Sequence, residues 1–121
     1  MRTRPDVISF LQVDGRDIPR DEQGYLLDPK LWDHDVAAKL AEEETVVLTD
    51  DHRAVLDFMR RYYDEHSIAA DARFVFAFLA ERRGETAAMA RRHFFELFPY
   101  GYVKQACKIA GMRQPRAWST G

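Results

Sequence analysis

The cysteine at position 107 and the basic residues around it have the clearest capacity for chemistry in this sequence. Cys107 is the only cysteine of the chain, with Lys104 three residues before it and Lys108 directly after it. A nearby positive charge favours the thiolate, which is the form that attacks sulfur or holds a persulfide. The thiol also comes late in a short expected helix, where the helix dipole raises the pKa of an acid. The sequence does not rank these two effects, and a free cysteine is often a small buried hydrophobe.

The sequence contains little evidence for other kinds of reactive centre. Four histidines are spread over different expected segments without a metal-ligand spacing, so we expect no metal site; they are His34, His52, His66 and His93. A glycine-rich phosphate loop and a nucleophile motif are also missing, and we expect no cofactor. We interpret the aromatic pairs Tyr62-Tyr63 and Phe94-Phe95 as parts of the core.

The composition is typical of one globular domain spanning residues 1–121. The chain is 46% hydrophobic and 31% charged, and no apolar run approaches the ~18 residues that a transmembrane helix needs. The first five residues lack the apolar core of a signal peptide. We therefore expect a cytoplasmic monomer that makes no membrane contact.

The charge is divided unevenly along the chain, although the net charge is only −2. Residues 97–121 contain no acidic side chain, and their four basic residues are Lys104, Lys108, Arg113 and Arg116. Such a basic end on an acidic body favours an anionic partner or a stabilised anion. A solvated tail is the alternative interpretation.

The first 28 residues predict a small antiparallel β meander. Residues 7–13 are rich in β-branched and aromatic side chains, and Asp14-Gly15 is a two-residue hairpin signal before a return strand at Ile18. A second turn at residues 21–24 precedes a third short strand, Tyr25-Leu26-Leu27.

From residue 29 the apolar period changes to that of helices. The first helix is expected to begin at Pro29 with Asp28 as its cap and to include Trp32, Val36 and Leu40. A second begins after Thr49 or Asp50, and a third runs over about 70–83 with Gly84 as its C-terminal cap. The expected inward residues of the third helix are Phe74, Val75, Phe78 and Leu79.

The fourth helix starts near residues 85–86 and ends before Pro99, with Ala87, Ala90, Phe94 and Leu97 facing inward. A fifth covers residues 102–110 and stops at Gly111. The expected fold class is α+β, mostly α: the β meander (1–28) packs on a body of about five helices (29–111), followed by a C-terminal arm (112–121).

The sequence around Cys107 resembles the C-terminal signature of the DsrC/TusE family. Residues 97–115, LFPYGYVKQACKIAGMRQP, contain a phenylalanine-proline-x-glycine entry, a lysine-glutamine-alanine helix, an isoleucine-alanine-glycine stop and a proline-containing arm. Upstream, residues 21–26 resemble the family's acidic turn and glycine-tyrosine-leucine strand, and Trp32 and Val36-Ala37 recur in its first helix. The resemblance spans nearly the whole chain.

The resemblance implies a sulfur carrier rather than a turnover enzyme. Proteins of this family present a cysteine on a flexible C-terminal arm, receive sulfur as a persulfide and pass it on, either with dissimilatory sulfite reductase or toward tRNA thiolation. The dissimilatory pattern has a second cysteine eleven residues after the position of Cys107, but this chain has Trp118 there. Cys107 is then the sulfur acceptor, and the implied binding surround for an anion or partner is Lys104, Lys108, Arg113, Arg116 and Trp118.

A second hypothesis is a regulatory or docking module that has lost carrier activity. The third and fourth helices resemble a helix-turn-helix pair, and a basic edge on them would suit nucleic acid; it comprises Arg82, Arg83, Arg91 and Arg92. Trp118 would either enter the partner channel that the missing cysteine uses or pack on the protein's own body.

Overall fold

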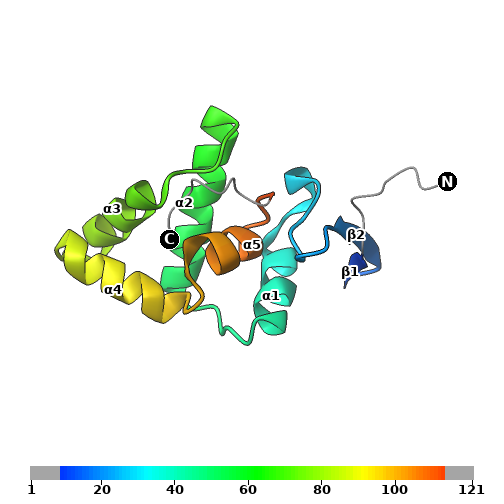
Figure 1. The fold of residues 1–121 in the computed structure, drawn as a ribbon, viewed down its shortest axis with the longest axis horizontal. Coiled ribbons are helices and arrows are strands. Elements are labelled where there is room, and N and C mark those ends of the chain that lie inside the picture. Colours follow the sequence, from blue (N-terminus) through cyan, green and yellow to red (C-terminus); the bar gives the residue numbers. More distant parts are fainter. Residues whose placement is uncertain (1–8, 114–121) are drawn as a thin grey trace.

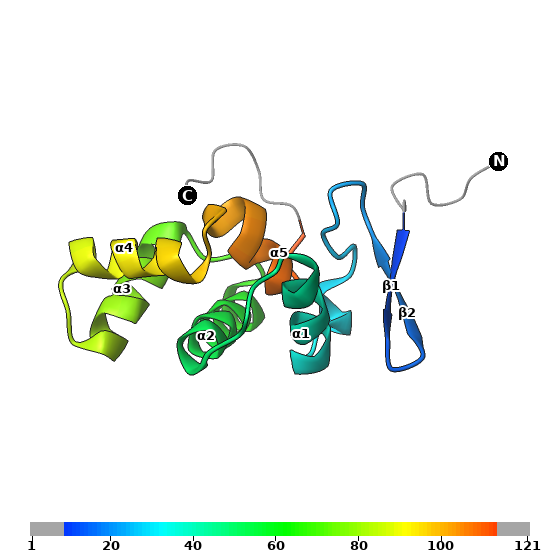
Figure 2. The same cartoon turned by 90° about the horizontal axis from the view of Figure 1, so that it is seen from below.

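The structure is a computed structural model that describes residues 9–113, and it consists of a β-hairpin followed by helices. The hairpin lies at one end of the molecule, and the helices Ala72–Arg83 (α3) and Ala87–Leu97 (α4) lie at the other (Figure 1). His34–Glu43 (α1) and Asp50–His66 (α2) lie between them. The C-terminal segment, which includes Cys107–Ile109 (α5), lies over α1 and α2 (Figure 2). The expected α+β, mostly α class is confirmed.

The hairpin forms where the sequence predicts it. Ser9–Val13 (β1) pairs antiparallel with Arg16–Arg20 (β2), and the turn residues Asp14 and Gly15 have φ values of 49° and 78°. Positive φ at both positions is the signature of the type I′ turn, whose twist matches that of the two strands. Val7 and Ile8 lie outside the described residues.

One face of the hairpin belongs to the core. Leu11, Val13 and Ile18 are at most 6% exposed, and β1 contacts α1. The expected third strand is reduced to one bridge between Arg20 and Leu26. The meander is therefore a two-stranded hairpin with one bridging residue.

The expected single helix from Pro29 onward is wrong. Pro29–Leu31 forms a 3₁₀ turn capped by Asp28, the chain is extended at Trp32, and α1 begins afterwards with Asp33 as its own cap. The Asp33 carboxylate accepts the N–H of Val36 at 2.9 Å. Two aspartates five residues apart each satisfy the free N–H groups of a new helical start, which favours a break over a continuous helix.

The remaining helices begin and end close to the expected positions. Thr49 caps α2, Asp71 caps α3 and Thr86 caps α4, while Gly84 ends α3 in the left-handed region. Such caps satisfy backbone groups that have no partner inside the helix. Among the described residues, no helix is long and apolar enough to cross a membrane.

Two of the expected inward faces need correction. In α3, Phe74 is 45% exposed and Phe76 is buried instead, and in α4 Ala87 is exposed. Residues 72–80 are apolar almost all round the helix, so their pattern does not define one face. The aromatic pairs are split: Phe94 is fully buried, whereas Phe95, Tyr62 and Tyr63 are partly buried against the core.

Candidate functional site at the C-terminal cysteine

The segment that carries Cys107 is helical over the expected residues, but its first part is not an α-helix. Tyr102–Ala106 forms a π-helical turn, which continues directly into α5 and ends at Gly111. Short π segments are rare and are frequently found at functional sites. The fifth helix is thus confirmed in position and differs in type.

Hydrogen bonds to three other parts of the chain hold the π-helical turn. The Tyr25 hydroxyl donates to the Val103 carbonyl at 2.7 Å, and the Tyr102 hydroxyl donates to the Ala70 carbonyl. The buried Gln105 amide donates to Glu44 Oε1 at 3.2 Å, and its own oxygen accepts the N–H of Tyr100 at 3.1 Å. The turn is fixed to the body over its whole length.

The thiol of Cys107 is closed off from solvent. The residue is 0% exposed and belongs to the hydrophobic core. Burial raises the pKa of Cys107 to about 12, because a charged thiolate is poorly solvated there. The nearby Tyr102 side chain, rather than either neighbouring lysine, partly opposes this shift of the pKa. At neutral pH the cysteine of this closed state is a thiol.

Of the basic residues near Cys107, Lys108 lies beside a carboxylate, whereas Lys104 and Arg113 are exposed. Lys108 Nζ lies 3.7 Å from Glu44 Oε2 and 5.3 Å from the centre of the Tyr25 ring, and Lys104 is exposed. Arg113 is exposed at the end of the described residues. The structure therefore places Lys108 beside Glu44, where its charge is paired.

The expected arm lies largely beyond the described part of the chain. Arg116 and Trp118 are outside the described residues, and so is Pro115. Met112, the first residue of the expected arm, is 2% exposed and packs in the core.

A contact that the sequence analysis missed holds the end of α5. Trp32 Nε1 donates to the Ile109 carbonyl at 2.8 Å, and Arg60 donates to the Ala110 carbonyl at 3.0 Å. A Cβ atom at Gly111 would lie 2.3 Å from Cδ1 of Trp32, so the helix end lies directly against the indole ring. Trp32 was expected only as a residue of the first helix and as part of the family resemblance, and nothing in the sequence pattern marks Arg60.

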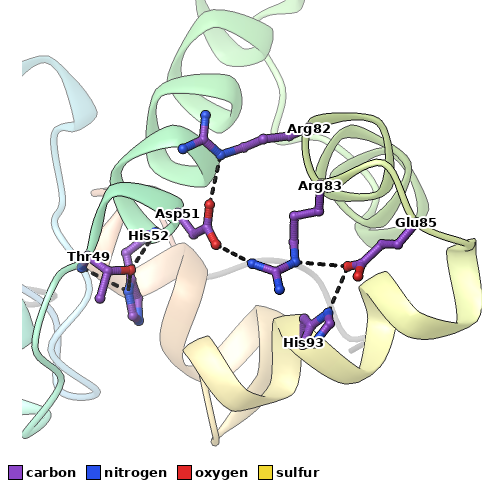
Figure 3. Close-up of polar contacts among 7 residues, drawn as sticks. All are labelled: Thr49, Asp51, His52, Arg82, Arg83, Glu85 and His93. Carbon is purple, nitrogen blue, oxygen red and sulfur yellow. Dashed lines mark hydrogen bonds and ion pairs between the residues drawn. The ribbon is translucent and has the colours of Figure 1, made fainter.

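Three of the four arginines proposed as a basic edge are engaged in other contacts, and the fourth, Arg92, is exposed. Arg82 and Arg83 pair with Asp51 at 2.8 and 2.5 Å, and Arg83 also pairs with Glu85 at 3.0 Å (Figure 3). The Arg91 guanidinium lies over the rings of two phenylalanines, Phe76 and Phe95. Paired cations are less available to phosphate groups, so this face does not favour nucleic acid.

The histidines serve structural contacts in the described chain. His52 bonds Thr49 at the start of α2, and His93 bonds Glu85 at 2.8 Å (Figure 3). His34 lies 3.0 Å from Asp57. Within residues 9–113, no group of three histidine, cysteine or acidic side chains is placed to hold a metal ion.

The sequence comparisons decide the family. Residues 12–117 match the family described as DsrC like protein. The chain belongs to the DsrC-like family. It is 39% identical over 106 residues to a protein named Sulfurtransferase TusE from Pectobacterium atrosepticum, covering 88% of this chain and 96% of that protein. It is 38% identical to Sulfurtransferase TusE from Yersinia pestis with the same coverage. This DsrC-like chain has no cysteine at position 118.

Solved DsrC structures have the same fold. The crystal structure of the oxidised gamma-subunit of the dissimilatory sulfite reductase (DsrC) from Archaeoglobus fulgidus superposes with a TM-score of 0.80 at 29% identity. The match covers 89% of this chain and 97% of the Archaeoglobus fulgidus protein. The NMR structure of Allochromatium vinosum DsrC gives a TM-score of 0.78 at 32% identity, with 90% and 96% coverage.

Proposed function

We propose that this DsrC-like protein is a sulfur-relay protein that accepts or passes persulfide sulfur between protein partners, with Cys107 as the sulfur-bearing residue. The observation that carries this proposal is the position of Cys107. It is the only cysteine of the chain, and it lies inside the segment that matches the family. Relatives named Sulfurtransferase TusE, aligned over 88% of the chain, support the sulfur-relay function.

The proposed reaction is a persulfide exchange without net oxidation. The Cys107 thiolate attacks the outer sulfur of a donor persulfide, the donor's sulfur–sulfur bond breaks, and the donor leaves as a thiolate. The proton lost by Cys107 ends on that leaving thiolate. The product is a Cys107 persulfide, and the reverse reaction with an acceptor thiol returns the free cysteine.

The closed structure is the protected state of this carrier. A thiol with a pKa of about 12 and no exposed surface does not react at an appreciable rate near neutral pH. Sulfur transfer therefore requires the Cys107 segment to open. Outside the core the pKa of the thiol returns toward its ordinary value, and Lys104 and Lys108 are then the nearest cations along the chain.

The proposed partners follow from the relatives. One group is named for sulfur transfer and another for dissimilatory sulfite reductase, so the partners proposed here are sulfur-relay proteins or that reductase. A cytoplasmic monomer is part of the proposal. Roles for Arg113, Arg116 and Trp118 in binding the partner also remain predictions.

The test is intact mass spectrometry after incubation with a low-molecular-weight persulfide donor. We expect wild-type protein to gain the mass of one sulfur atom and the Cys107→Ala variant to gain nothing. A reducing agent should remove the added sulfur. If the native protein remains unmodified while urea-unfolded protein is modified normally, Cys107 of the folded protein accepts no sulfur, and a docking module without carrier activity becomes the better account.

A further inference from the structure

The end of the Cys107 helix is closed by its own backbone. Met112 N–H donates to the Cys107 carbonyl at 3.0 Å, and Gly111 N–H donates to the Lys108 carbonyl at 3.1 Å. Gly111 has a φ of 74°, which a glycine adopts without cost. This is the Schellman arrangement of a helix C-terminus, and it satisfies two carbonyls that have no partner inside the helix.

Side chains from elsewhere satisfy the next two carbonyls. Trp32 Nε1 donates to Ile109, and Arg60 donates to Ala110, at 2.8 and 3.0 Å. All four carbonyls from residue 107 to residue 110 are therefore bonded, two of them by residues distant in sequence. A helix end that solvent would normally satisfy is attached to the body of the protein.

Arg60 joins three segments at this point. Its guanidinium also donates to the Pro29 carbonyl at 2.7 Å and lies 4.8 Å from the centre of the Trp32 ring. Burial lowers the pKa of Arg60, so the cation has lost part of its hydration and relies on these carbonyl and ring contacts. Removing the side chain would loosen α2, the 3₁₀ turn and the helix end together.

The contacts that hold the C-terminal end of the Cys107 segment lie within reach of solvent. Ile109, Ala110 and Met112 are themselves at most 2% exposed, but the side chains that bond this end, Trp32 and Arg60, are only partly buried. A partner can therefore reach the hydrogen bonds from Trp32 and Arg60 without first entering the core.

We propose that Arg60 and Trp32 form a latch that holds residues 107–112 closed with the Cys107 thiol inside, and that release of this latch gives a partner access to the thiol. The proposal rests on the sulfur-relay function proposed above. Arg60 and Trp32 act as positioning residues, because neither takes part in the exchange reaction. A partner that displaces the helix end from Arg60 would expose the thiol without unfolding the remaining helices.

The latch is tested by the rate at which Cys107 is alkylated by iodoacetamide under native conditions, followed by intact mass. We expect Arg60→Met to raise this rate about ten-fold or more, since hydrogen bonds from a charged donor are among the stronger ones. The Trp32→Phe variant keeps an aromatic ring but loses the indole N–H donor, so it should raise the alkylation rate by a smaller factor. Arg60→Lys retains a donor and should lie between wild type and Arg60→Met.

A matched control distinguishes latch release from general destabilisation. Arg61 is the exposed neighbour of Arg60 on the same helix, and Arg61→Met should leave the rate unchanged. The alkylation rate is also measured over a range of low urea concentrations. Local opening is nearly independent of urea, whereas global unfolding accelerates steeply with it. The lower global stability of Arg60→Met by itself predicts some increase in the alkylation rate of Cys107. If the measured rate is no higher than that, the latch proposal is wrong.

The same variants separate this proposal from the proposed function. If alkylation accelerates as expected but the persulfide donor adds no sulfur to wild type or to Arg60→Met, the latch stands and the relay function fails. If sulfur is added at the same rate to wild type and to Arg60→Met, Cys107 reacts by another opening and the latch fails.

Discussion

His52 joins the start of α2 to the end of α4 through the backbone of Leu97. Its Nε2 atom donates to the Leu97 carbonyl at 2.7 Å, while Nδ1 accepts the backbone N–H of Thr49 at 3.0 Å. The imidazole ring packs edge-on against the ring of Phe98, with the two ring centres 5.0 Å apart. A neutral imidazole satisfies both bonds, whereas a protonated one has no acceptor for Thr49. The residue therefore fixes the point where the chain enters the Cys107 segment.

Acid should destabilise the protein through His52. Burial lowers the pKa of His52 below its ordinary value of 6.5, so the neutral ring stabilises the fold above that pH and the contribution is lost as pH falls through the folded-state pKa. Urea unfolding from pH 8 to pH 5 should show the free energy of unfolding falling, with a shallower fall in His52→Gln. The exposed His66 provides the control, and His66→Gln should keep the wild-type slope. Parallel curves for His52→Gln and wild type would rule out this role.

Alkaline pH should weaken the fold through Cys107. Its pKa is raised from 9.0 to about 12, so the buried thiol contributes stability that is complete below pH 9 and is lost as pH rises toward 12. We expect the free energy of unfolding to fall over this range and to fall less in Cys107→Ala. The pKa values of Tyr25 and Tyr102 are also raised by burial, so part of the slope remains in the variant. Identical slopes would contradict the burial of the thiol.

Gly111→Ala should cost more stability than a glycine substitution at another helix end. The added Cβ would lie 2.3 Å from Trp32, and the residue has a positive φ, so we expect a loss of more than about 2 kcal/mol. Gly84→Ala is the matched control, because Gly84 also has a positive φ but has nothing within 4 Å of the added Cβ. Its cost should be about 1 kcal/mol. If Gly111→Ala and Gly84→Ala lost the same free energy of unfolding in urea, the helix end would not press on Trp32.

Asp51→Asn should destabilise the protein modestly and in a salt-dependent way. Asp51 pairs with Arg82 and Arg83, which lowers the pKa of its carboxyl, but both arginine side chains are more than a third exposed. We expect a loss of at most about 1 kcal/mol at low salt that shrinks when salt is added. Asp50→Asn, in the same first turn of α2, controls for the helix dipole. A salt-independent loss would indicate packing instead of charge.

Local rules predicted much of the chain. The Asp14-Gly15 turn and the stop at Gly84 were correct, and the cap of α2 is Thr49, one of the two residues expected, because each of these features depends on a few neighbouring residues. The start of the first helix was wrong because Asp28 and Asp33 are both competent caps and the sequence does not show which one wins. The exposure of Phe74 was missed because the apolar residues of α3 do not define a face.

The sequence by itself determined the family, the single cysteine and the helix that carries it, because motif residues and the absence of a second thiol are properties of the chain alone. The tertiary structure decided the state of that cysteine. The flanking lysines favour a thiolate and the helix dipole opposes it, and the sequence did not rank the two effects; packing buries the thiol and pairs Lys108 with Glu44. Arg60 and Trp32 are distant in sequence from the helix end that they hold. Burial and long-range hydrogen bonds depend on which segments meet in space, so they become visible only in the folded protein.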